Sequence, residues 1–248
     1  SSGSYTLTSA PSITNVSESK TIYYQITATN YTTKTGSFEC SVTQAENPIS
    51  LSETSGTIAY PNSGTFTVSG AQGTLSVASS NMDVATASVS DTTVTMKSVK
   101  PGSATITVTA AGNENYKDGS KTYALTVVKG TNTLTLSATS GITSYPSSKT
   151  FTVSKNTSNG ALSVSSSSTG VATASISGTT VTMTPKATGT ATITVTSAAT
   201  DYYNEAKATY TLTVNKGTIT LDNNSATSAG TAKIYQTYNT NVYLSNWG

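Results

Sequence analysis

The chain has 248 residues, a formal net charge of +2 at pH 7 and only 10% charged side chains, with no histidine and one cysteine. So weakly charged a sequence excludes the dense basic patch that nucleic-acid binding requires, and a single cysteine excludes an internal disulfide. The lack of histidine removes the most common general base and the most common metal ligand.

A tandem repeat of about 85 residues runs through the middle of the chain. Tyr60-Pro61 returns as Tyr145-Pro146, and the stretch 84–88 (VATAS) returns at 171–175. Ser and Thr dominate the composition and alternate with Val, Ile and Leu, a pattern typical of β-strands with one buried face. Since a period this long is a complete small domain, we predict an all-β chain of consecutive modules.

Residues 1–47 are predicted to be the C-terminal part of an incomplete module. Val42 aligns with the end of the last strand in both complete copies, which makes 22–29 the penultimate strand and 37–43 the last. On this alignment Cys40 takes the position of a core leucine, so we expect it to be buried and inert. The segment is either the tail of a module cut at its start, or it borrows strands from elsewhere, because an isolated hairpin is marginal in water.

Residues 48–130 are predicted to form one complete module. Short alternating runs separated by Gly, Ser, Asn, Asp and Pro predict a sandwich of two antiparallel sheets. The predicted strands are 49–52, 65–69, 74–78, 84–90, 93–97, 103–110 and 121–128. The expected core positions are Phe66, Val68, Leu75, Val77, Val89, Val94, Met96, Ile106, Val108, Leu125 and Val127.

Residues 131–217 are predicted to form a second module of the same kind, with apolar residues at the equivalent alternating positions of each strand. Agreement between two copies strengthens the prediction, because a slip of one residue would turn the apolar side chains to water. The expected core positions are 134–136, Phe151, Val153, Leu162, Val164, Ile176, Val181, Met183, Ile193, Val195, Leu212 and Val214.

Residues 218–248 do not match the module and are predicted to begin a further, incomplete β-module. Two predicted strands, 218–221 and 232–238, flank a turn-rich stretch, and the only tryptophan is Trp247. The joints between modules are too short for a loose coil. The predicted fold class is therefore all-β, with tandem immunoglobulin-like β-sandwiches in an elongated arrangement.

The sequence contains no catalytic constellation. A Gly-x-Ser-x-Gly elbow is absent, and the acidic residues are few and scattered, as expected of solvated turns. We predict no enzyme activity, no cofactor and no metal. The nearest approach to a calcium site, which needs about six to eight oxygen ligands, is the loop with Glu114, Asn115 and Asp118.

Two features are candidates for contact with a partner. Tyr116 and Tyr203 occupy equivalent loops, where we expect structural anchors that pack the ring and bond the hydroxyl to the backbone. Exposed tyrosines contacting a glycan or protein are the alternative. The only clear length difference between the copies is a loop that we predict as a possible ligand-contact site, made of Asn156, Thr157, Ser158, Asn159 and Gly160.

The two copies share a longer pattern: Val-Ala-Thr-Ala-Ser, then Thr-Val-Thr-Met, then Gly-x-Ala-Thr-Ile-Thr-Val-Thr, then Tyr-x-Leu-Thr-Val. This pattern resembles the bacterial Ig-like group 2 domains of intimin- and invasin-type surface proteins. Residues 21–43 look like the C-terminal half of a related module, and 218–238 resemble the start of a Listeria–Bacteroides-type repeat. The resemblance implies a large, exported, multi-domain surface protein, with no shared catalytic residues to carry over. The matching stretches are 84–97, 102–109 and 123–127, with 171–183, 189–196 and 210–214.

We therefore expect a non-enzymatic stalk or spacer of an extracellular bacterial surface protein, in the manner of an adhesin. The alternatives are an adhesive module that binds a host glycan or protein, and a decoration or fibre protein of a phage virion. The incomplete ends also predict self-association, because unpaired strand edges attract partners. No signal peptide begins the chain and no apolar run of about 18 residues could span a membrane, so we expect an interior segment or export signals outside it.

Overall fold

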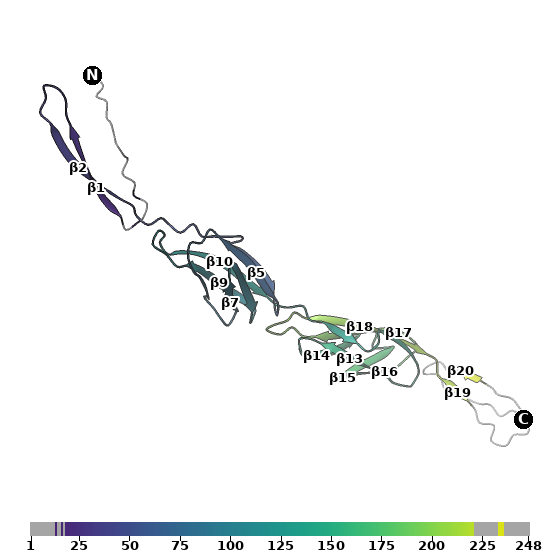
Figure 1. Cartoon of the computed structure of the whole chain (residues 1–248). Helices are drawn as coiled ribbons and strands as arrows, with labels where there is room; N and C mark the ends of the chain where they lie inside the picture. Colours follow the sequence, from purple (N-terminus) through teal and green to yellow (C-terminus); the bar gives the residue numbers. More distant parts are fainter. Residues whose placement is uncertain (1–12, 14–15, 17, 221–232, 236–248) are drawn as a thin grey trace, which may run out of the picture. The chain divides into compact units, whose positions relative to one another are not determined.

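The structure of the chain is a computed structural model in which residues 13, 16, 18–220 and 233–235 are described. All regular secondary structure in these residues is β-strand (Figure 1). Contacts between residues divide the chain into two compact units, 1–128 and 129–248.

A β-hairpin opens the first unit. β1 (Ser19–Ile26) pairs antiparallel with β2 (Lys34–Ser41), and the register places Ile22 opposite Phe38. Both predicted strands exist, each shifted a few residues toward the N-terminus. The prediction that Cys40 is buried is wrong, because the residue is only half-buried. In the described part of the chain the hairpin is a two-stranded sheet, and neither buried core cluster includes it.

The first module is a sandwich of two four-stranded sheets. One sheet has the strand order β4-β10-β9-β6 and the other has the order β3-β5-β8-β7. The strands are β3 (Ser50–Leu51), β4 (Ser55–Ala59), β5 (Ser63–Ser69), β6 (Leu75–Ser79), β7 (Ala85–Ser90), β8 (Thr93–Ser98), β9 (Gly102–Ala110) and β10 (Gly119–Val128).

The core of this module lies between its two sheets. Phe66 of β5 and Ile106 of β9 come from different sheets and belong to one buried cluster. Ser and Thr take most of the intervening positions and stay largely exposed, as expected when successive side chains point to opposite faces. The predicted core positions are confirmed: most are buried, and Leu75, Val77 and Val89 are half-buried against the cluster.

The second module has the same plan. Its sheets have the orders β12-β18-β17-β14 and β11-β13-β16-β15. Its predicted core positions are again buried or half-buried, apart from Thr135 in the stretch 134–136, which is exposed. The repeated order confirms the fold class of tandem immunoglobulin-like β-sandwiches. The strands are β11 (Leu134–Leu136), β12 (Ser140–Ser144), β13 (Lys149–Asn156), β14 (Leu162–Ser166), β15 (Ala172–Ser177), β16 (Thr180–Pro185), β17 (Gly189–Ser197) and β18 (Ala206–Asn215).

Each module contains one strand that the sequence pattern did not predict. β4 pairs in parallel with β10, and β12 pairs in parallel with β18. The expectation of purely antiparallel sheets is therefore wrong. The β4 sequence, SGTIA, carries too short an apolar run to show alternation, so only pairing with the last strand of the module reveals it.

A stacked aromatic pair joins the two sheets of each module. Phe66 lies on Tyr123 with ring centroids 4.5 Å apart, and Phe151 lies on Tyr210 with centroids 4.4 Å apart. The two tyrosines are 4% and 1% exposed, although their core role was not predicted. A Cβ at Gly56 would lie 2.1 Å from the Tyr123 hydroxyl oxygen, so the unpredicted strand β4 makes room for the ring by carrying glycine there.

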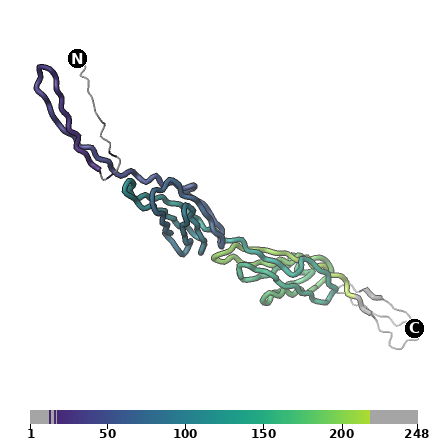
Figure 2. Tube along the Cα trace, in the orientation of Figure 1, coloured from purple at the N-terminus to yellow at the C-terminus, as the bar shows by residue number. Residues whose placement is uncertain are grey.

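Beyond the second module, β19 (Thr218–Thr220) pairs antiparallel with β20 (Lys233–Tyr235). The pairing agrees with the strands predicted in this segment, while the turn between them and Trp247 lie outside the described residues. In Figure 2 the tube colours follow the sequence through one module and then through the other. The sheets of the first module contain only strands β3 to β10, and those of the second contain only β11 to β18.

Candidate functional site

The predicted ligand-contact loop connects β13 to β14 in the second module. Asn156 is the last residue of β13, and Asn159 has a φ of 53°, a left-handed conformation that asparagine tolerates better than most residues. A Cβ at Gly160 would lie 2.1 Å from the carbonyl oxygen of Ala198. Glycine is therefore required where the loop passes close to this backbone.

Two side chains of the loop bond to two side chains from other segments, and we call the four the Asn132 network: Asn132, Asn156, Ser158 and Ser197. Asn132 Nδ2 donates to Asn156 Oδ1 at 3.2 Å and to Ser197 Oγ at 3.0 Å. Ser197 Oγ and Ser158 Oγ each donate to Asn156 Oδ1, at 2.9 and 3.1 Å. Asn132 is 6% exposed and Ser197 is fully buried, so these groups need the partners that the network provides.

The network leaves little of the loop for a ligand. Asn156 and Ser158 are half-buried and engaged inward, whereas Thr157 and Asn159 are exposed. Direct contact with a partner is therefore limited mainly to those two side chains, and neither is ionisable. The loop length was visible in the sequence, but the bond from Asn156 to Ser197 spans 41 residues, which no local pattern reveals.

At the equivalent place in the first module, the asparagine bonds to backbone groups instead of to other side chains. Asn47, which aligns with Asn132, donates to the carbonyls of Gln72 at 3.0 Å and Lys117 at 3.3 Å. Its Oδ1 accepts the Gln72 N–H at 3.0 Å. Ala110 stands at the position of Ser197, so the first module has no hydroxyl there to extend a network.

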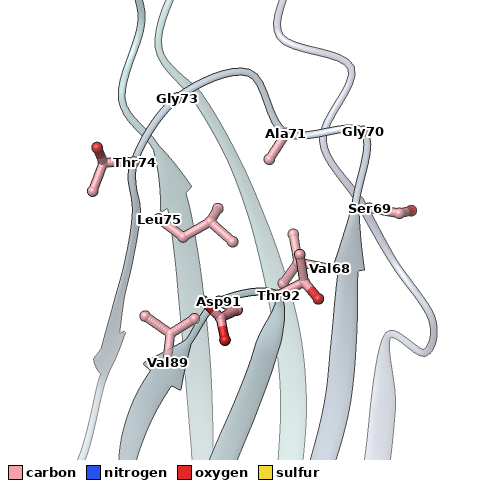
Figure 3. Close-up of a pocket in the computed structure, with 10 residues that line it drawn as sticks. All are labelled: Val68, Ser69, Gly70, Ala71, Gly73, Thr74, Leu75, Val89, Asp91 and Thr92. Carbon is pink, nitrogen blue, oxygen red and sulfur yellow. The ribbon is translucent and has the colours of Figure 1, made fainter.

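A groove of about 470 Å³ opens beside this corner in the first module (Figure 3). Val68, Leu75 and Val89 supply apolar walls at the edge of the core, and Asp91 and Thr92 come from the turn between β7 and β8. Asp91 is the only ionisable residue in the lining. A single carboxylate without a second acid, a base or a nucleophile offers no acid–base pair for catalysis.

A backbone clamp ties the segment just before each module to the loop before that module's last strand. Ala45 forms a parallel bridge with Tyr116, and Gly130 forms the equivalent bridge with Tyr203. The clamp uses both the N–H and the C=O, with bonds of 2.9 and 2.9 Å at Ala45 and of 2.8 and 3.0 Å at Gly130. These clamps are made by backbone groups, so the prediction that the rings of Tyr116 and Tyr203 pack and their hydroxyls bond to the backbone stays a prediction.

A backbone hydrogen bond and an ion pair engage two side chains of the loop considered for calcium. Asp118 Oδ1 accepts the Gly112 N–H at 2.6 Å, and Lys117 Nζ pairs with Glu46 Oε1 at 2.6 Å in an exposed ion pair. Among residues 13, 16, 18–220 and 233–235, no three His, Cys, Asp or Glu side chains are grouped to hold a metal. The same residues contain no helix with the length and apolarity to cross a membrane.

The two stacked tyrosines have shifted pKa values. Burial raises the pKa of Tyr123 above 10.0, and the negative charge of Glu53 raises it further. Burial likewise raises the pKa of Tyr210. Both phenols therefore stay protonated around neutral pH, which suits packing and gives no general base.

Comparisons with known proteins return structures but no sequence relatives. No protein-family model matches the chain, and no curated protein sequence matches it. Domains 4 and 5 of the S-layer protein SbsC are 22% identical, with 56% of this chain and 75% of that chain covered and a TM-score of 0.30. Titin domains z1z2, in complex with telethonin, are 14% identical, with 69% and 98% covered and a TM-score of 0.39.

Extracellular cadherin domains 3–6 of protocadherin gamma B2 are 12% identical, with 84% of this chain and 61% of that chain covered and a TM-score of 0.32. Similarity at this level says nothing about activity or partners. The immunoglobulin-like assignment rests on the strand order and on the packing of the two sheets in each module.

Proposed function

We propose that this chain is a non-enzymatic spacer segment of an exported bacterial cell-surface protein, in which modules 48–130 and 131–217 carry a functional element away from the cell. The resemblance to bacterial Ig-like group 2 domains supports an extracellular location and an adhesin-like context. The features that recur in the described residues are contacts that hold each module together, namely the stacked aromatic pairs and the backbone clamps, and they favour a mechanical role.

The length of the joint between the modules is the observation that carries the proposal. The carbonyl of Val128 accepts the Tyr60 N–H at 3.0 Å within the first module. On the other side of the joint, the backbone clamp holds Gly130 to the Tyr203 loop of the second module. Only Lys129 lies between these two bonded residues, so the joint has very few free backbone dihedrals.

The strand pairing within each module also suits a load-bearing role. β4 lies near the start of the first module and runs parallel to its last strand, β10. Tension between the two ends of the module would pull these strands in opposite directions along their axes. The hydrogen bonds between the strands would then bear the load together, rather than opening one at a time.

Distance measurements across the joint test the proposal. In a Cys40→Ser background, spin labels at the exposed equivalent positions Ser88 and Ser175, introduced as S88C and S175C, report the separation of the two modules by pulsed electron resonance. We expect a narrow distance distribution that broadens when four Gly/Ser residues are inserted after Lys129. A distribution that is already as broad without the insertion would contradict the spacer proposal.

An adhesive role is the second candidate, supported by the length difference at 156–160. If this loop grips a glycan or protein, the exposed Thr157 and Asn159 carry the contact. Thr157→Ala with Asn159→Gly keeps the left-handed backbone available and should abolish binding on a glycan array. Thr67→Ala on the exposed face of β5 is the matched control. The absence of binding by the unmodified chain would count against this role.

A further inference from the structure

The groove of the first module lies beside a loop that is shorter than its counterpart in the second module (Figure 3). Four residues, 70–73, form the loop between β5 and β6, whereas six residues, 155–160, occupy the equivalent stretch of the second module. There the longer loop contributes Asn156 and Ser158 to the Asn132 network, and both side chains are half-buried. The shorter loop of the first module leaves the edge of the core uncovered at this end of the sandwich.

The groove has apolar walls and a rim that is fixed by backbone contacts. Leu75 of β6 and Val89 of β7 come from different sheets, and each packs half-buried against the core. A Cβ at Gly73 would lie 2.0 Å from the carbonyl oxygen of Ala111, so the rim loop lies directly on this backbone. The groove is therefore preformed, and a ligand does not have to order the loop when it binds.

Asp91 adds one negative charge to this apolar lining. It is exposed, and it is the only ionisable residue that lines the groove. Among residues 18–220 its carboxylate forms no hydrogen bond or ion pair. Its backbone is left-handed, with a φ of 51°, and the equivalent residue of the second module is Gly178, with a φ of 56°. Since this backbone favours glycine, the aspartate stands there at a conformational cost, and what it adds is a carboxylate at the groove.

We propose that this groove, which we call the Asp91 groove, binds a lysine side chain of a partner protein. The hydrocarbon stem of the lysine packs along Leu75 and Val89, and its ammonium pairs with the Asp91 carboxylate. The charges are complementary, because the lining holds one carboxylate and no cation. The volume of about 470 Å³ lies within the range of about 300–1,000 Å³ that is usual for ligand pockets.

Lysine suits the Asp91 groove better than arginine does. Its longer hydrocarbon stem covers more of the aliphatic walls, and the lining has no aromatic ring on which a guanidinium could stack. The inference is independent of the spacer role and of the loop at 156–160, because it rests on a different module and a different loop.

Titration of the full chain with a blocked lysine, Nα-acetyl-lysine N-methylamide, tests the proposal. Amide cross-peaks of residues 69–75 and 89–92 in nuclear magnetic resonance spectra should shift saturably, while those of the second module should stay in place. Asp91→Asn keeps a residue that tolerates the left-handed backbone and should weaken binding about fivefold, because the ion pair is lost. Asp83 lies just before β7, whereas Asp91 lies just after it, so Asp83→Asn removes an equal charge at the other end of the strand and should leave the affinity unchanged.

Three results would overturn the proposal. The first is the absence of a saturable shift in the cross-peaks of the Asp91 groove. The second is an equal affinity of Asp91→Asn and the unmodified chain. The third is equally tight binding of blocked norleucine, which has the same four-carbon stem without the ammonium, since the groove would then recognise hydrocarbon alone. An affinity for blocked lysine that falls with added salt, together with weaker binding of blocked norleucine, would support the proposal.

Discussion

Replacing Phe151 with alanine removes one ring of the stacked pair that joins the two sheets of the second module. Phe151 is 4% exposed, and its centroid lies 4.4 Å from that of Tyr210. Truncation of a buried Phe to Ala typically costs about 3–5 kcal/mol. A module of this size has a total stability of about 4–13 kcal/mol, from roughly 0.05–0.15 kcal/mol per residue. We therefore expect F151A to remove between about a quarter and all of the stability of the second module.

The first module should be unaffected by this substitution, because the two buried clusters share no residue. Urea unfolding followed by the amide cross-peaks in nuclear magnetic resonance spectra gives a separate curve for each module. F151A should lower the midpoint for the second module only. The matched variant Phe66→Ala should do the reverse, since Phe66 makes the equivalent stack with Tyr123.

Two outcomes would refute this reasoning. If F151A lowered the midpoints of both modules together, the modules would form one cooperative unit, and the argument from separate cores would fail. If the loss were below about 1 kcal/mol, within the range of ordinary point substitutions, the stacked pair would not be what holds the two sheets together.

Three further predictions concern the second module. Gly160→Ala should lower its stability markedly in thermal unfolding, because the new Cβ meets a backbone carbonyl, whereas Gly170→Ala, which meets nothing within 4 Å, should change it little. Asn132→Ala should cost about 1–3 kcal/mol in urea unfolding, because it removes the donor to Ser197 Oγ and Asn156 Oδ1 and the acceptor of the half-buried Ser158 N–H; an unchanged midpoint would mean that the network is dispensable. Burial raises the pKa of Tyr210 in the folded state, so the neutral phenol stabilises the module fully below the unfolded pKa of 10.0, and this stabilisation is lost as pH rises through the folded pKa. Tyr210→Phe should therefore reduce the loss of unfolding free energy at alkaline pH, measured by urea unfolding in a pH series. An equal loss in both proteins would contradict the assignment.

The sequence predicted the parts of the fold that depend on alternation along a single strand. Phe66, Val94 and Ile106 were predicted as core from their phase alone, and all three are buried. The repeat was equally visible, because two copies with the same phase constrain each other. Such features are local, since the direction of a strand side chain follows from the parity of its position.

The candidate site was only partly predictable. The length difference at 156–160 marked the loop, but not the fact that Asn156 and Ser158 turn inward to Asn132 and Ser197. For Cys40, alternation along the strand predicted more burial than the structure shows. Its phase predicted burial, yet the described hairpin has no facing sheet to bury it.

What the sequence alone determined is the all-β class, the repeated module and the faces of most strands. Tertiary structure decided which strands pair and which polar side chains meet. The parallel strand β4 and the burial of Tyr123 depend on contacts between segments more than 50 residues apart, such as those of Tyr123 with Gly56 and Phe66. Alternation carries no information about such distant partners, because it specifies which face a side chain occupies and not what lies opposite that face.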